Sequence, residues 1–331
     1  MNFNNYSPYR TLFFSLTTLM LCAILILTLI SLYIGTGSLY AESGYNFLLK
    51  LRFYRIITAF LCGGMLALGS AILQTATKNP MIAPDLTGMT SIGCLLIIIS
   101  QIFFTHSAIS NVVLGIIGAS LGFIFCFILS YKNNNRTSLI INGIALSFSA
   151  SALMQIIILK APREVENYIT FLAGSLYATS FETCSLILTI ATIVIPAALI
   201  FSRKLSVLTL DTETSKSLGT PIAIYIFISF FLASLLIGTS IIGIGNMGFL
   251  GIVAPNLVRI FVGNRSNYLF FLTFLIGGFI YLLADTIGRH ILSGSEIPAG
   301  IMSNIISAPI FLIILYYFYR EPNGKHFFKK H

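Results

Sequence analysis

The sequence predicts an all-α integral membrane protein with about ten transmembrane helices, and two observations support this fold class. The first is composition: 56% of the 331 residues are hydrophobic, 9% are charged, and the mean hydropathy is +0.93. These values lie outside the range of soluble globular domains. The second is patterning, because charge-free windows of about 20 residues, the length that crosses a bilayer, recur along the chain.

Ten segments are expected to span the membrane within a single transmembrane domain. The first has 24 uncharged residues and no small-residue cleavage site at its end, which favours a retained span over a signal peptide. Between Pro221 and Val258 a Gly-rich centre, GTSIIGIGNMGFLGIVAP, predicts a broken or short span. Paired glycines at Gly63-Gly64 and Gly277-Gly278 predict close helix contacts. The expected spans are residues 11–34, 56–77, 86–104, 109–131, 137–159, 183–202, 221–240, 246–262, 267–288 and 297–319.

Charge distribution predicts the orientation. With both termini on one side of ten spans, that side carries thirteen of the 19 Lys and Arg residues, and the opposite side carries six. The positive-inside rule therefore places both termini in the cytoplasm. Three of the six outer charges lie in KLRFYR, just before the span 56–77, and such a positive outer rim suggests an acidic ligand or an acidic docking protein. The basic excess needs no nucleic-acid partner, because basic residues flanking spans set orientation.

The longest polar interruption, residues 203–220, divides the chain into two membrane halves and is expected on the cytoplasmic side. Asp211 is placed to cap a short helix that has Lys216 near its end, Gly219 after it and Pro221 as its stop. So short a helix is marginal in water. It is therefore expected to rest on its own membrane domain or on a partner, with an ordinary connecting loop as the alternative.

No catalytic motif is visible, and no Walker motif, HExxH, GxSxG or zinc-type Cys/His cluster occurs in the sequence. The five cysteines are scattered singly, as small apolar residues would be. Any nucleotide hydrolysis must then occur on another chain. Asp285 is the one ionisable residue clearly deep in a span, and Arg289, four residues later, can pair with it. A stand-alone secondary carrier or channel would depend on Asp285.

Seven segments, in order, resemble the membrane-spanning permease of ATP-binding-cassette (ABC) importers for iron-siderophore, haem and cobalamin, the large type II family. The resemblance covers nearly the whole chain, from about Leu51 to Tyr319. Two departures stand out: Arg52-Phe53-Tyr54-Arg55 lacks the proline of the family's Arg-x-Pro-Arg, and Pro255-Asn256 replaces its Pro-His. The matching segments are Arg52–Gly88, Asn142–Ser147, Leu172–Ser180, Leu208–Gly219, Gly248–Arg259, Leu282–Arg289 and Glu296–Phe311.

The resemblance implies a role for three groups of residues. Docking of the substrate-binding protein through its acidic residues is implied for Arg52, Arg55 and Arg289. A cytoplasmic gate is implied for Asn79, Pro80, Met81, Thr137 and Ser138. Coupling to the ATPase, within the segment 203–220, is implied for Leu208, Leu210, Asp211, Glu213, Lys216, Ser217, Leu218 and Gly219.

The resemblance also implies the function: a permease subunit, not itself an enzyme, that moves an iron chelate across the bacterial cytoplasmic (inner) membrane by alternating access. A ferric siderophore is the expected substrate, with haem and cobalamin as alternatives. Expected partners are ATPase subunits that carry ATP and Mg, a second copy or related permease, a periplasmic or lipid-anchored substrate-binding protein, and membrane lipid. No cofactor is expected on this chain, and whether it forms a homodimer or a heterodimer is left open.

Overall fold

The computed structural model describes residues 7–33, 45–103, 107–131, 136–160, 165–177, 179–209, 221–246, 248–264, 266–292 and 295–320. Over these ranges the regular structure is helical, with eleven α-helices and two short 3₁₀ helices. Eight of the α-helices are long and apolar enough to cross a membrane. The predicted fold class, an all-α multi-pass membrane protein, is confirmed.

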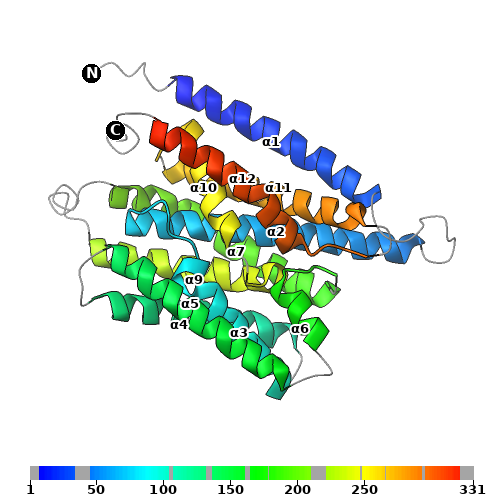
Figure 1. The fold of residues 1–331 in the computed structure, drawn as a ribbon. Helices are drawn as coiled ribbons and strands as arrows, with labels where there is room; N and C mark the ends of the chain where they lie inside the picture. The colour runs from blue at the N-terminus through cyan, green and yellow to red at the C-terminus, as the bar shows by residue number, and fades with distance from the viewer. Residues whose placement is uncertain are drawn as a thin grey trace, which may run out of the picture.

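The helices follow one another without an intervening strand in the described part of the chain (Figure 1). The two 3₁₀ helices are η2 (Asp85–Thr87) and η3 (Ser206–Thr209). The α-helices are α1 (Ser7–Tyr33), α2 (Tyr45–Thr77), α3 (Met89–Phe103), α4 (Ala108–Tyr131), α5 (Arg136–Leu159), α6 (Val165–Leu172), α7 (Phe181–Leu205), α9 (Ile222–Ile244), α10 (Phe249–Val262), α11 (Ser266–Ile291) and α12 (Ala299–Arg320).

Each of the ten expected ranges contains a helix, and two of these, α3 and α10, are short at 15 and 14 residues. The chain does break between α9 and α10, where Gly245 has a φ of 65° that glycine adopts without strain. Two elements differ from expectation. Helix α2 begins at Tyr45 and not at residue 56. The expected span started after the charged residues, but Arg55 lies within the helix, where it pairs with Asp285. Helix α6 has eight residues, and a search for apolar windows of about 20 residues does not detect so short a helix.

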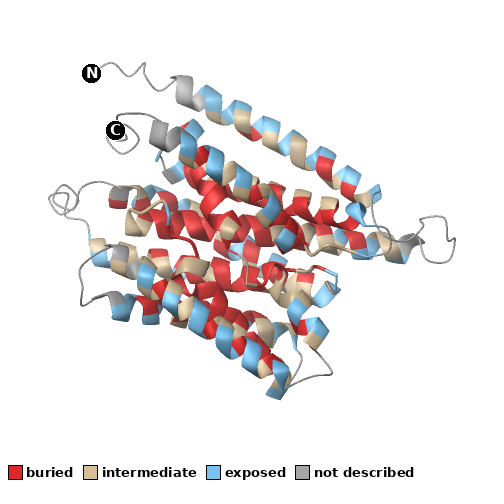
Figure 2. Cartoon of the chain, viewed as in Figure 1, coloured by how far each residue is buried: buried red, intermediate tan, exposed pale blue. Residues whose placement is uncertain are grey.

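Helix α2 lies at the centre of the bundle, between α11 on one side and α9 on the other (Figure 1). In its most apolar window 83% of the residues are buried, compared with 72% in α11 and 11% in α1. Figure 2 shows the same gradient, with buried positions concentrated on the inner helices and exposed ones along α1. Helix α1 therefore turns most of its surface outward, as a lipid-facing helix does.

Glycines bring α2 and α11 into backbone contact. A Cβ atom added at Gly63 would lie 2.7 Å from the carbonyl oxygen of Gly277 and 2.4 Å from Cβ of Tyr281. A Cβ atom at Gly277 would in turn lie 2.7 Å from the Gly63 carbonyl oxygen. These separations leave no room for a side chain, so the glycine pairs do mark a close helix contact, as predicted.

Replacing Gly63 by valine should push α2 and α11 apart. Overpacking of this kind costs about 1–3 kcal/mol, so we expect a thermal unfolding midpoint several degrees lower for the purified protein in detergent. Ser15→Val introduces the same side chain at an exposed position of α1 and serves as the control. Equal midpoints for the two variants would contradict the assignment of this contact.

Candidate functional site

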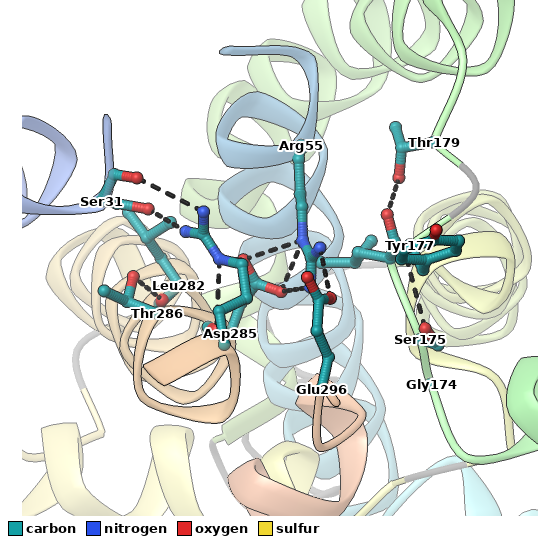
Figure 3. Close-up of polar contacts among 12 residues, drawn as sticks. Ser31, Arg55, Gly174, Ser175, Tyr177, Thr179, Leu282, Asp285, Thr286 and Glu296 are labelled. Carbon is teal, nitrogen blue, oxygen red and sulfur yellow. Dashed lines mark hydrogen bonds and ion pairs between the residues drawn. The ribbon is translucent and has the colours of Figure 1, made fainter. Parts of the chain in front are cut away.

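Near the first turns of α2, acidic and basic side chains from three parts of the chain converge (Figure 3). The Nη2 atom of Arg55 lies 2.7 Å from Oδ1 of Asp285, and its Nε atom lies 2.9 Å from the same oxygen. Its Nη1 atom donates to Oε2 of Glu296 at 2.7 Å. Arg55 thus joins α2 to α11 and to the segment before α12, using the forked geometry that makes guanidinium–carboxylate pairs strong.

Two more arginines extend this group to the end of α1. Arg289, one helical turn after Asp285, lies 3.1 Å from Oδ2 of that residue and donates to the carbonyl oxygen of Ser31 at 3.3 Å. Arg52 donates through Nη1 to the carbonyl oxygen of Leu32 at 2.8 Å. The last carbonyls of a helix lack partners within the helix, so cations are favourable there. We call Arg52, Arg55, Asp285, Arg289 and Glu296 the arginine cluster.

The arginine cluster is largely buried. Arg52 and Arg289 are 7% and 4% exposed, and the Asp285 side chain is fully buried. The pairing of Asp285 with Arg289 is confirmed. The three arginines predicted to dock a binding protein lie together, but each already contacts groups of this chain. Their docking role stays a prediction, and their first structural role is to connect α1, α2 and α11.

A cavity of about 340 Å³ opens beside the arginine cluster, lined by all of its members except Asp285. Three guanidinium groups against two carboxylates leave the cluster with one excess positive charge. An acidic group that enters this cavity would therefore meet a favourable potential. The other lining residues are Leu48, Leu51, Leu176, Tyr177 and Thr179.

Of the predicted coupling residues, the described part of the chain contains only Leu208. Its side chain is buried, and η3, which contains it, packs against α2 and α7. The start of the coupling segment is therefore attached to the central helix. Leu210, Asp211, Glu213, Lys216, Ser217, Leu218 and Gly219 lie outside the described residues.

The predicted gate residues lie on two elements. The turn Asn79–Met81 follows α2, and the Pro80 carbonyl oxygen accepts a hydrogen bond from Nδ2 of Asn256 in α10 at 2.9 Å. Ser138, in the first turn of α5, accepts one from Asn142 at 3.2 Å, whereas the side chain of Thr137 is outside the described set. Helix α5 packs on η2, a few residues beyond the turn. Whether these elements form a gate stays a prediction.

One buried polar group was not predicted from the sequence. Arg259 in α10 is 7% exposed and hydrogen-bonded to Gln74 in α2 and Asn256 in α10. A glutamine inside an otherwise apolar span is the signal that could have pointed to it, because buried polar residues in spans need partners. In the described residues no group of three or more His, Cys, Asp or Glu side chains could hold a metal ion.

The comparison with known families covers nearly the whole chain. The FecCD transport family matches residues 11–317. This chain belongs to that family. The resemblance to importer permeases is thereby confirmed, and FecCD family members are transport permeases.

Individual relatives agree with the family assignment. The Fe(3+)-citrate import system permease protein YfmE of Bacillus subtilis strain 168 is 31% identical over 315 residues, which cover 91% of this chain and 95% of the relative. The molybdate import system permease protein MolB of Haemophilus influenzae is 29% identical over 273 residues, 81% of this chain and 80% of the relative. A solved inward-facing structure of a metal-chelate type ABC transporter shares 28% identity at a TM-score of 0.80, covering 93% of this chain and 99% of that one.

Replacing Asp285 by asparagine should destabilise this FecCD permease strongly. The change keeps the shape of the side chain but leaves Arg55 and Arg289 without their shared buried carboxylate, and breaking a buried pair in this way costs about 3–5 kcal/mol. We expect a large drop in the thermal unfolding midpoint in detergent. Glu296→Gln, at a partly exposed position, should have a clearly smaller effect; equal effects would argue against Asp285 as the centre of the cluster.

Proposed function

We propose that this FecCD permease is the membrane-spanning subunit of an ATP-driven importer that moves a ferric chelate across the bacterial cytoplasmic membrane. The observation that carries the proposal is the family match from residue 11 to residue 317, which includes every described membrane helix in whole or in part. The similarity to a ferric-citrate permease over 95% of the relative's length supports the substrate class.

ATP hydrolysis then takes place on separate ATPase subunits, which bind ATP and Mg, and this chain holds no cofactor. The segment 203–220 receives the movement of the ATPase, and Leu208 transmits it, because its buried side chain attaches η3 to the central bundle. Two permease subunits, identical or related, face each other across the passage. Alternating access follows when the two bundles move against each other.

We place the arginine cluster on the outer side and the turn Asn79–Met81, with the start of α5, on the cytoplasmic side as the gate. The two termini and the segment 203–220 are then cytoplasmic, in agreement with the excess of basic residues there. A periplasmic or lipid-anchored binding protein docks over the cavity beside the cluster, and its acidic residues meet Arg52, Arg55 and Arg289.

The geometry disfavours a proton-coupled carrier based on Asp285. Its carboxylate contacts both Arg55 and Arg289 and its side chain is fully buried, so both of its oxygens are engaged by groups of this chain. Asp285 therefore joins α2 to α11 and is not open to an ion or substrate.

The direct test is uptake by proteoliposomes that contain the permease with its ATPase and its binding protein. We expect uptake of radioactive ferric citrate or of a ferric siderophore only when ATP is present on the side of the membrane that the ATPase subunits face. Uptake without ATP would contradict the ABC mechanism. ATP-dependent uptake of molybdate but of no iron chelate would keep the mechanism and refute the substrate.

Charge reversal of a buried arginine would damage the fold, so docking is better tested from the acidic side of the cluster. Glu296→Gln removes the negative charge that faces Arg55 Nη1 and so raises the net positive charge beside the cavity. We expect a several-fold tighter complex with the binding protein at low salt, mainly through faster association. The gain should shrink as salt screens it. Glu182→Gln, an exposed change at the start of α7, is the control.

Leu218→Pro should uncouple the transporter. Proline inside a helix destabilises it by about 3 kcal/mol or more. We therefore expect that the loaded binding protein still docks on the assembled complex but no longer stimulates its ATPase activity. Leu218→Met keeps the apolar volume and should retain stimulation. Full stimulation of the proline variant would refute the coupling role of the segment 203–220.

A further inference from the structure

A second polar cavity lies at the other end of α2, where Gln74 is about 28 Å along the helix from Arg55 at 1.5 Å per residue. Its volume is about 70 Å³, and a single water needs roughly 10–15 Å³ on this measure. We call it the Arg259 pocket. It is lined by Gln74, Thr75, Lys78, Asn79, Pro80, Arg259 and Asn264.

Arg259 is held in place by three neutral oxygen atoms. Its Nη1 atom donates to Oδ1 of Asn256 at 3.0 Å and to Oε1 of Gln74, and its Nε atom donates to Oδ1 of Asn264 at 3.1 Å. A guanidinium has five N–H donors in a rigid plane. The contacts use Nε and Nη1, so the two N–H groups of Nη2 remain for the cavity that Arg259 lines.

The two buried amides can only present their oxygens to Arg259. The amide nitrogen of Gln74 donates to the carbonyl oxygens of Ile82 and Gly251, at 3.0 and 3.3 Å. That of Asn256 donates to the carbonyl oxygen of Ile252 at 2.8 Å, besides its bond to the segment after α2. The orientation of the guanidinium is therefore set by the backbones of several elements before any ligand arrives.

No described carboxylate lies within ion-pair distance of Arg259, although the residue is 7% exposed. None of the seven residues lining the pocket is acidic, and Lys78 brings a second positive charge. A buried cation with neutral partners only is costly, and an anion would compensate it. The arginine cluster, at the opposite end of α2, shows the contrasting arrangement with two carboxylates.

We propose that the Arg259 pocket binds a phosphate-type oxyanion, supplied by the head group of an anionic phospholipid or by soluble phosphate. A planar guanidinium edge next to an ammonium group suits a phosphate. The pocket sits where two apolar helices end, and the neighbours of Arg259, Ile260 and Phe261, are 44% and 46% exposed. Basic pockets between helix ends with apolar surface beside them are typical of lipid head-group sites.

Native mass spectrometry and thermal shift of the full-length permease test the proposal. One arm titrates phosphatidylglycerol, with phosphatidylcholine as the neutral reference, and the other arm titrates inorganic phosphate in a neutral detergent. We expect the anionic lipid to bind at least tenfold more tightly than phosphatidylcholine and to raise the unfolding midpoint. A shift in the phosphate arm assigns the site to soluble anions as well, and a shift in the lipid arm alone assigns it to lipid.

Two substitutions separate an anion site from a structural arginine. Asn264→Asp places a carboxylate on the Nε side of the guanidinium, at an exposed position. We expect this variant to fold, to be at least as stable as the parent, and to lose tenfold or more in affinity for the anion. Lys78→Gln should lose about threefold, in line with the weakness of a partly exposed ion pair. Arg203→Gln, at an exposed position of α7 that does not line the pocket, removes one positive charge and should change little.

Three results would overturn the proposal. One is unchanged binding of both anions to Asn264→Asp and Lys78→Gln. Another is an equal loss in Arg203→Gln, which would mean diffuse attraction to the surface. If Asn264→Asp instead weakened assembly with the ATPase while neither anion bound the parent, the partner of Arg259 would be a protein carboxylate and the oxyanion site would be refuted.

Discussion

The close approach of α2 and α11 is the constraint on which the rest of the structure depends. At Gly63 and Gly277 the two backbones touch, and no larger residue fits at either position. The ion pair of Arg55 with Asp285 joins the same two helices near the first turns of α2. Apolar close packing needs rigid, fixed spacing, and a buried ion pair needs good geometry to offset its desolvation. The glycine contact holds α2 and α11 at the fixed distance that the ion pair needs, and the ion pair in turn keeps the two helices packed together.

Helix α2 carries a different kind of polar site at each end. At the arginine cluster the charges come close to balance, with three cations and two anions from the chain itself. Near Arg259 the described residues supply neutral oxygens. The first site is complete as a structural unit and has a small positive excess for an incoming group. The second is oriented but has no counter-charge among the described residues, and this is why we propose a bound anion there.

Each of the ten apolar ranges read from the sequence overlaps a described helix, because length and apolar character are what the bilayer selects. The sequence alone gives a later start for α2, since a charged residue is read as the end of a span unless its partner is known. That partner, Asp285, is 230 residues away from Arg55 in the sequence. The same distance in sequence explains why Glu296 and Ser31 were not assigned to the cluster. Arg259 was counted as a charge of the cytoplasmic side, and its burial depends on the fold of α2 against α10.

The end of α1 is attached through main-chain oxygens, apart from one hydroxyl. Arg52 contacts the carbonyl of Leu32, and Arg289 contacts the carbonyl and the hydroxyl of Ser31. Every type of residue presents the same carbonyl group. This attachment depends on where the helix ends and hardly on which side chains it carries. The first helix of such a permease can therefore change most of its sequence over evolution, as long as it stays apolar and its last turn still reaches the two arginines.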